Sequence, residues 1–220
     1  MPKTMRRDIL AVLFGVVALA LAGGTTTAQA KTAGIFGAVE IPRKGLRPFP
    51  KWTGALERHF RQMAEKKGPC EATLFTKCYY DNWQKLIAYN RNATPGGQLD
   101  SVNRYMNKAR YIIDPINWGV RDYWASPLQF FRKDGDCEDY AIAKYLTLRA
   151  LGWKADTMRI VVLQDMNLRI AHAILSVYFN GKILLLDNQI GQVVDSRNVR
   201  HYQPIYSVNE NGWWRLRPAR

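Results

Sequence analysis

The chain contains 220 residues, of which 47% are hydrophobic and 23% are charged, and its formal net charge is +14. This length suits one domain with a sizeable core, and the lack of repeats and low-complexity tracts excludes a repeat architecture. The basic charge favours anionic partners such as acidic protein segments, lipid headgroups or polysaccharides, but no base-reading motif is present, which argues against nucleic-acid binding.

Residues 1–30 have the pattern of a secretory signal peptide. The basic opening MPKTMRRD precedes an uncharged apolar run, ILAVLFGVVALALAG, and Ala28 and Ala30 form an A-x-A cleavage site. An uncleaved membrane anchor is the alternative, although a bilayer span needs about 20 apolar residues. Cleavage after Ala30 removes three bases and one acid, which lowers the net charge from +14 to +12. The mature protein is then expected in the periplasm without a stable membrane span.

A flexible lead-in is predicted for residues 31–50, where glycines and prolines show little periodicity. The folded domain is expected to span residues 51–220. Three helices should open this domain, because apolar side chains recur there at helical spacing. The predicted core-facing stripes are Trp52, Leu56, Phe60 and Met63, then Trp83, Leu86 and Ile87, then Leu99, Val102, Tyr105, Met106 and Ala109.

The three cysteines leave one thiol over after any pairing. Cys70 and Cys78 lie close together in GPCEATLFTKC, where glycine and proline make a small disulfide loop geometrically easy in an oxidising compartment. Cys137 is then the free thiol. A free thiol in an exported protein is either buried or used.

A long ordered loop is predicted for residues 114–131, which are rich in aromatic residues and prolines. The stretch CEDYAIAKYLTLRALG then predicts a buried helix, because it is apolar on most faces and ends at Gly152, a glycine C-cap. Asp136 is the predicted N-cap, and Asp139 takes the acidic position of a capping box. Cys137 is therefore expected in the first helical turn.

Beyond this helix the hydrophobic period changes to two, which is typical of strands. The predicted strands are MRIVVL, RIAHAILSVYF and KILLLDN, and Asn180-Gly181 between the last two is a type I′ hairpin signal. A second Asn-Gly, Asn211-Gly212, joins QPIYSVNE to WWRLR. Helices followed by a central buried helix and an antiparallel sheet define an α+β domain.

A cysteine nucleophile needs a base, and the sequence offers His59, His172 and His201. We expect His59 to be solvated on a polar helix segment, and His201 has no evident acidic partner. The hairpin register places His172 and Asp187 diagonally on one face of the sheet, with backbones about 5.5–8 Å apart. This geometry permits a triad of Cys137, His172 and Asp187 as nucleophile, base and orienting carboxylate. The alternative is an inert buried thiol beside unrelated polar residues.

The motifs WGVRDYW, DGDCEDYAIAKYLTL, AHAIL and LLLDNQ resemble those of the bacterial transglutaminase-like cysteine peptidases, which include the LapG-type periplasmic proteases. The resemblance covers residues 50–206. It implies a papain/transglutaminase-like fold, with Cys137, His172 and Asp187 at the family's catalytic positions. It also implies a protein substrate. LapG-type members cut large surface adhesins in biofilm control and are held inactive by the periplasmic domain of a cyclic di-GMP-sensing inner-membrane receptor.

Four carboxylates crowd the thiol of Cys137 in DGDCEDY. The helix N-terminus favours a thiolate through about half a positive charge, but neighbouring carboxylates raise the pKa of a thiol and outweigh it. A hard divalent cation bound by acidic oxygens would neutralise the cluster. The resemblance implies calcium, with Asp136 and Glu138 as ligands and Asp139 as a third. A solvated N-cap cluster is the alternative.

Acyl transfer also needs an oxyanion hole. The backbone N–H of Cys137 is the expected first donor, and Trp118, Trp124 and Gln129 are candidates for the second. Together these features predict an exported, calcium-dependent cysteine endopeptidase. Two alternatives stay open: a transglutaminase or amidase with the same triad, and a non-catalytic, calcium-stiffened module that binds envelope polymers or a partner protein.

Overall fold

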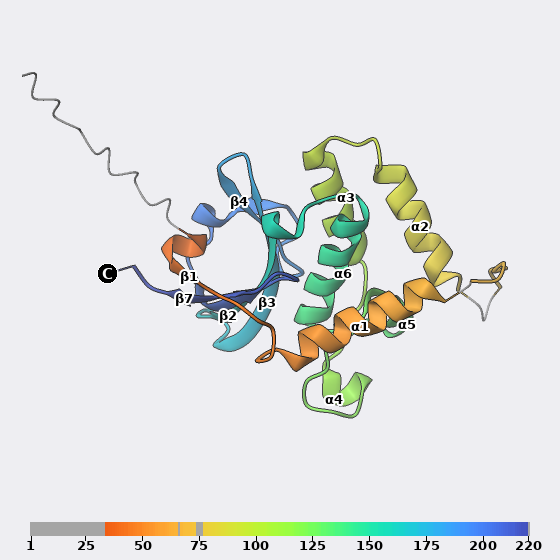
Figure 1. Ribbon diagram of the computed structural model, residues 1–220, viewed down its shortest axis with the longest axis horizontal. Coiled ribbons are helices and arrows are strands. Elements are labelled where there is room, and N and C mark those ends of the chain that lie inside the picture. The colour runs from red at the N-terminus through yellow and green to blue at the C-terminus, as the bar shows by residue number, and fades with distance from the viewer. Residues whose placement is uncertain (1–33, 66, 74–76, 220) are drawn as a thin grey trace, which may run out of the picture. The chain divides into compact units, whose positions relative to one another are not determined.

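The computed structural model describes residues 34–65, 67–73 and 77–219, so the predicted signal peptide lies outside the described residues. The described chain combines a group of helices with a seven-stranded antiparallel sheet (Figure 1). This architecture confirms the predicted α+β class. Among the described residues, no helix is both long and apolar enough to span a bilayer.

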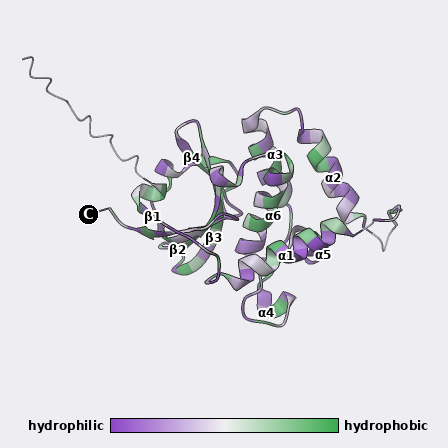
Figure 2. Ribbon diagram, viewed as in Figure 1, coloured by the Kyte–Doolittle hydropathy of each residue, from purple (hydrophilic) through white to green (hydrophobic). Residues whose placement is uncertain are grey.

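The helices precede most of the sheet in the chain. They are α1 (Pro50–Ala64), α2 (Tyr79–Asn90), α3 (Pro95–Met106), α4 (Asp114–Asn117), α5 (Pro127–Lys133) and α6 (Cys137–Ala150). The first three confirm the predicted amphipathic helices, and hydrophobic and hydrophilic residues alternate along the outer helix α2 (Figure 2). One predicted core residue is misplaced, because Phe60 is 56% exposed.

The prediction of a loop for residues 114–131 is wrong, because α4 and α5 form within it. Each of these helices has a proline at its start, where a fixed φ and a missing N–H are both tolerated. At the start of α5 the Gln129 side chain also accepts a hydrogen bond from the Ser126 N–H at 3.0 Å. These capping signals are local, but the density of aromatic residues hides them.

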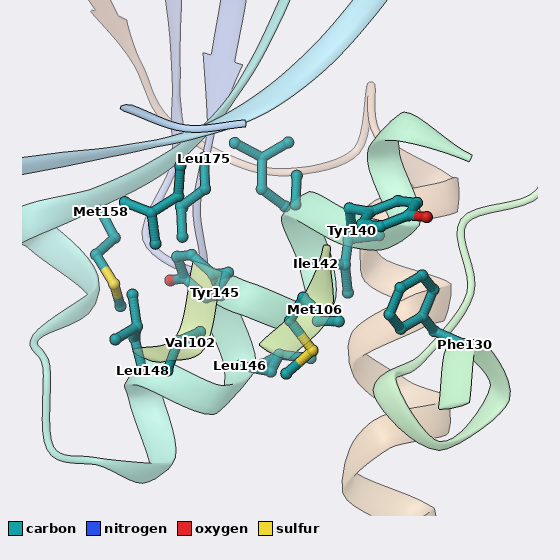
Figure 3. Packing of buried hydrophobic residues seen from close by; sticks show 14 of the residues in the cluster. Val102, Met106, Phe130, Tyr140, Ile142, Tyr145, Leu146, Leu148, Met158 and Leu175 are labelled. Carbon is teal, nitrogen blue, oxygen red and sulfur yellow. The ribbon is translucent and has the colours of Figure 1, made fainter. Parts of the chain in front are cut away.

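α6 is the central helix of the hydrophobic core. Figure 3 shows Tyr140, Ile142 and Tyr145 of this helix within a cluster that also includes Val102 and Met106 of α3, Phe130 of α5, Met158 and Leu175. A helix enclosed on nearly all sides must be apolar on nearly all sides, as the sequence is. Gly152 follows its last turn with a φ of 96°, which confirms the predicted glycine C-cap.

Neither of the two capping interactions predicted for the N-terminus of α6 forms. Asp136 occupies the N-cap position, but its side chain makes no capping hydrogen bond. Asp139 does not complete a capping box either, because its Oδ1 accepts a hydrogen bond from the Ala125 N–H at 2.6 Å. Burial against the preceding segment therefore replaces the local capping interaction.

The sheet has the order β1-β7-β6-β2-β3-β4-β5. Its strands are β1 (Val39–Arg43), β2 (Met158–Asp165), β3 (Ile170–Phe179), β4 (Lys182–Leu186), β5 (Val194–Asp195), β6 (Tyr202–Val208) and β7 (Trp213–Arg217). Phe179 pairs with Lys182, and Asn180 and Gly181 both have positive φ, which confirms the type I′ hairpin and its register. Side chains of β3 alternate between two cores, with Leu175 on the α6 side and Ile174 on the other.

The predicted lead-in at residues 31–50 has to be corrected. The 3-10 turn Ile35–Gly37 buries Ile35 completely, and β1 pairs with β7 at one edge of the sheet. The domain therefore begins before residue 51. β1 escapes sequence analysis because VEIPR is short and contains a proline, which is typical of an edge strand but gives no clear alternation.

Cys70 and Cys78 form the predicted disulfide, just before α2, and Cys137 is a free, buried cysteine. The bridge joins residues eight positions apart. A covalent link stabilises a fold mainly by restricting the unfolded chain, and removing a link of this kind costs about 2–4 kcal/mol.

We therefore expect Cys70→Ser to lower the free energy of unfolding by about 2–4 kcal/mol in denaturant titrations under oxidising conditions. Under reducing conditions the variant and the wild type should unfold at the same denaturant concentration. Equal midpoints in both conditions would mean that the bridge does not stabilise the protein.

Candidate active site and cation site

Cys137 lies at the start of α6 with its thiol directed toward β3. The side chain is buried, and Sγ donates a hydrogen bond to Glu138 Oε2 at 3.1 Å. The backbone N–H of Ala173 and the hydroxyl of Tyr111 lie near enough to Sγ to act on its proton equilibrium or be acted on by it. Ala173 directly follows His172 in β3, so the thiol lies against the strand segment that carries this histidine.

His172 and Asp187 form a buried pair. Asp187 Oδ1 is 2.9 Å from His172 Nε2, and its Oδ2 accepts a hydrogen bond from the Tyr202 hydroxyl at 2.7 Å. The backbone N–H of Gln189 also donates to Oδ1, at 2.9 Å. Burial opposes the ionisation of Asp187, but the hydrogen bond and charge of His172 hold the pKa of this carboxyl below its usual range.

The hydrogen bond to Asp187 determines which nitrogen of His172 is available for other chemistry. Nε2 is engaged by the carboxylate, so Nδ1 is the ring nitrogen left to exchange a proton with a neighbouring group. The structure thus brings together the Asp187 carboxylate and the His172 imidazole, as the hairpin register predicted. The Cys137 thiol lies near the backbone N–H of the next residue, Ala173.

The thiol of Cys137 is held in its protonated form in this arrangement. Burial is the largest cause, and the negative charges of Glu138 and Asp136 add to it, so that the pKa of the thiol lies well above its ordinary value. The Ala173 N–H acts in the opposite direction but does not compensate. The fold therefore keeps the acids close enough to the thiol to oppose its ionisation, as the sequence indicated.

Asp114, Asp136 and Glu138 gather beside the thiol, with one oxygen of each within 4.8 Å of the others. Burial, followed by the charges of Glu138 and Asp114, raises the pKa of Asp136 to about 8. Asp114 Oδ1 and Asp136 Oδ1 are buried and have no hydrogen-bond partner among the described residues. Crowded carboxylates with unpartnered oxygens are the donor set that a hard divalent cation prefers.

Asp139, the third predicted ligand, is not one of these three acids. It is fully buried, Ala125 engages its Oδ1, and burial raises its pKa well above the ordinary value. A Cβ on Gly135 would lie 2.2 Å from Asp139 Oδ2, so this carboxyl is packed beneath the loop that leads to Cys137. Asp114 rather than Asp139 belongs to the group whose oxygens lie within 4.8 Å of one another, and Asp139 stays a predicted ligand whose buried Oδ2 has no hydrogen-bond partner among the described residues. No local signal marks Asp114 in the sequence, because it joins the other two acids only through the fold.

The two remaining histidines, His59 and His201, lie outside the group formed by Cys137, His172 and Asp187. His59 is buried rather than solvated, and burial lowers the pKa of its imidazole to about 4. Its ring packs against Trp83 at a centroid distance of 5.8 Å. The ring centroids of His201 and Tyr202 are 4.3 Å apart, and the His201 side chain forms no ion pair with an acidic residue in the described part of the chain.

The predicted second oxyanion donors differ in their availability. Arg58 contacts both the Gln129 side chain and the Trp124 carbonyl, so these two residues serve as packing and anchoring groups. Trp118 has a buried Nε1 without a partner among the described residues. The sequence analysis missed Tyr111, whose hydroxyl lies near the thiol, because a tyrosine 26 positions earlier in the chain carries no motif.

Comparison with known proteins places these features in context. The sequence profile of the bacterial transglutaminase-like cysteine proteinases matches residues 69–218. The structure resembles Legionella pneumophila LapG, with 30% identity, a TM-score of 0.59, and coverage of 73% of this chain and 87% of LapG. Calcium-bound LapG matches with 32% identity, a TM-score of 0.60 and coverage of 73% and 87%. EGTA-treated LapG matches with 32% identity, a TM-score of 0.60 and coverage of 74% and 86%. No curated protein sequence is detectably similar.

The geometry of the acids predicts that Asp114→Asn weakens calcium binding by at least about tenfold, because the substitution removes one anionic ligand without changing side-chain size. Calorimetric titration of calcium into chelator-treated protein measures this change. Asp100→Asn is the matched control, since Asp100 is exposed in α3, lies outside the group of three acids and should leave the affinity unchanged. Equal affinities in Asp114→Asn and the wild type would exclude Asp114 as a ligand.

Proposed function

Because the chain belongs to the bacterial transglutaminase-like cysteine proteinases, we propose that it is an exported, calcium-dependent endopeptidase that uses Cys137, His172 and Asp187 as its catalytic triad. The observation that carries the proposal is the buried hydrogen bond between His172 and Asp187, together with a buried thiol on which the backbone N–H of Ala173, the residue next to His172, acts. Acyl transfer needs a nucleophile, a base and an orienting acid, and the three residues can fill these roles in that order.

In the proposed reaction His172 Nδ1 takes the proton of the Cys137 thiol, and the sulfur attacks the carbonyl carbon of the scissile peptide bond. The imidazolium then gives its proton to the leaving amine, and a thioester on Cys137 is left. Water, deprotonated by His172, hydrolyses the thioester and frees the thiol. Asp187 keeps the ring oriented and stabilises its charged form throughout.

The developing oxyanion needs two donors. The backbone N–H of Cys137 is one, because it belongs to the unpaired first turn of α6. The Tyr111 hydroxyl suits the second role, since it lies near the thiol and its pKa is raised by partial burial and by Cys137, so that it stays a donor at neutral pH. This assignment replaces the tryptophan and glutamine candidates of the sequence analysis.

Asp114, Asp136 and Glu138 would hold calcium, which supplies positive charge beside a thiol that the acids otherwise keep protonated. Glu138 links the two sites, because the oxygen that accepts the thiol hydrogen belongs to one of the three acids. A Glu138 carboxylate committed to a cation is a weaker acceptor for the thiol, which leaves the Cys137 proton for His172. Calcium in one LapG structure and a chelator in another support the same cofactor here.

The proposed substrate is a large surface adhesin, and the proposed regulator is the periplasmic domain of a cyclic di-GMP-sensing receptor in the inner membrane. The family and the similarity to LapG support a protein substrate. The net charge of +12 that remains after removal of residues 1–30 suits an acidic face on either partner. Export through the N-terminal signal peptide would deliver the enzyme to the periplasm.

Three substitutions test the triad. Cys137→Ala and His172→Ala should abolish cleavage, and Asp187→Asn should lower kcat by about 10³–10⁴-fold, because the ring loses its orienting carboxylate. The measurement is the appearance of new N-termini in exported acidic proteins after incubation with the mature enzyme. Product masses separate hydrolysis from amine transfer. A near-normal rate in any variant whose melting temperature matches the wild type would remove that residue from the mechanism.

Removal of calcium provides an independent test. Excess EGTA should abolish cleavage and slow the alkylation of Cys137 by iodoacetamide, since the acids then keep the thiol protonated. Added calcium should restore both, whereas magnesium should not, because it prefers six ligands at shorter distances. Full activity in excess EGTA would contradict the calcium requirement.

A further inference from the structure

Strand β3, which lies beside α6 in Figure 1, extends further than its neighbour β4. It pairs with β2 along residues 170–177, whereas β4 pairs only with residues 175–179. Residues 170–174 therefore have a neighbouring strand on one side only, and their other side is the free edge of β3. Ala171 in this segment is exposed, so nothing in the described part of the chain covers it.

The hairpin register determines which backbone groups lie on the free edge. Phe179 and Lys182 flank the two-residue turn and form a hydrogen-bonded pair. Along an antiparallel ladder such pairs recur at every second residue, so every second residue of β3, counted back from Phe179, directs its N–H and C=O to the β4 side. Ala173 and Ala171 continue this series beyond the end of β4. The Ala173 N–H acts on the Cys137 thiol and lowers its pKa, which agrees with a direction away from β2.

The two alanines differ in what they face. Ala173 is buried near the Cys137 thiol, whereas the N–H and C=O of Ala171 have no backbone partner on this side among the described residues. Strand residues that point the same way repeat every two positions, or about 6.8 Å. An extended chain that forms hydrogen bonds with Ala171 thus passes the thiol within about two of its own residues.

The free edge lacks the features that usually protect a strand from pairing with another chain. Exposed edges commonly carry charged residues, a proline or a bulge. The segment IAHAI has no lysine, arginine, acid or proline, and its ladder with β2 runs without a register shift. Beside it, Leu168 and Ile170 are 58% and 47% exposed. Large exposed apolar side chains next to an unprotected edge indicate a binding surface.

We propose that the free edge of β3 binds the substrate polypeptide as an added strand, with the Ala171 N–H donating to a substrate carbonyl and the Ala171 carbonyl accepting from a substrate N–H. The inference rests on the proposed peptidase function, because the occupant is assigned as a substrate from the position of the thiol on the same edge. Main-chain hydrogen bonds supply the affinity in strand addition. The substrate is therefore an extended segment, and apolar side chains suit its contact with Leu168 and Ile170.

Ala171→Pro tests the N–H of the free edge. Proline is tolerated in a strand where the N–H faces away from the paired neighbour, so the ladder with β2 should remain. With calcium present, acetyl-Leu-Leu-Ala chloromethyl ketone should alkylate Cys137 about threefold to tenfold more slowly in the variant than in the wild type, the usual effect of one backbone hydrogen bond. Iodoacetamide, which is too small to reach Ala171, should react equally fast with both. An unchanged peptidyl rate in a folded variant would overturn the proposal.

Lys154→Pro is the matched control. Lys154 is exposed, its φ of −75° suits proline, and it lies near the end of β2 that is remote from the free edge. Both reagents should alkylate this control at the wild-type rates. A slower peptidyl rate in Lys154→Pro would mean that the effect of proline is not specific to the free edge, and this would also contradict the proposal.

Methylated reagents test the Ala171 carbonyl in the wild-type protein, so they do not depend on the folding of a proline variant. Three versions of the peptidyl reagent each carry a methyl group on one backbone nitrogen. The version that loses the N–H facing Ala171 should react about threefold to tenfold more slowly than the parent, after division by its rate with glutathione. Equal corrected rates for the parent and all three versions would overturn the proposal.

The amide of Ala171 separates this inference from the proposed catalysis. In calcium-loaded Cys137→Ala, the unreactive acetyl-Leu-Leu-Ala amide should shift the ¹⁵N–H resonance of Ala171 and slow its exchange with solvent. This result, combined with a wild-type thiol that no reagent alkylates, would support the free edge and remove Cys137 as the nucleophile. An unchanged Ala171 resonance at saturating peptide would overturn strand addition even if the enzyme cleaves proteins.

Discussion

The buried hydrogen bond between His172 Nε2 and Asp187 Oδ1 is the interaction on which the rest of the site depends. The register of the β3–β4 hairpin puts both residues on one face, and β4 ends just before Asp187, so the carboxylate can turn toward the ring. The Tyr202 hydroxyl and the Gln189 N–H satisfy the oxygens that the histidine does not fully use. A shift of one residue in the hairpin would separate the pair onto opposite faces.

The start of α6 combines two opposing electrostatic effects. The free N–H groups of the first turn favour a thiolate, whereas burial and the carboxylates of Asp136 and Glu138 favour the thiol. Without a bound cation, burial and the carboxylates outweigh the helix N-terminus, so the thiol form is favoured. A thiol that is unreactive until a cation binds to the neighbouring acids would protect an exported cysteine from oxidation, and it would make the nucleophile dependent on the composition of the surroundings.

Polar groups in the core are concentrated around the same two residues. The side chain of Asn107 binds the backbone of Asp187, the Tyr202 hydroxyl binds its carboxylate, and Asp139 lies buried beneath the loop before Cys137. Each of these groups costs free energy where it lies, whereas the surrounding cluster of apolar side chains from α3, α5, α6 and the sheet stabilises the fold. The apolar core thus offsets the cost of a polar site that needs fixed orientations.

Elements with local sequence signals could be predicted without the structure. Periodicity predicted α1, α2 and α3, the Asn-Gly pair predicted the hairpin and hence the meeting of His172 with Asp187, and two nearby cysteines predicted the bridge. β1 gave no such signal, because a five-residue edge strand with a proline lacks a readable alternation.

Packing between whole elements brings together site groups that are distant in the chain. Tyr111 and Asp114 lie more than twenty positions before Cys137 in the chain, yet Tyr111 lies near the thiol and Asp114 meets the acids Asp136 and Glu138. The same packing buries Asp139 beneath the loop before Cys137 and removes His59 from solvent. Hydrogen-bond registers repeat over a few residues and can be read from letters, whereas burial and the meeting of charges depend on how whole elements pack.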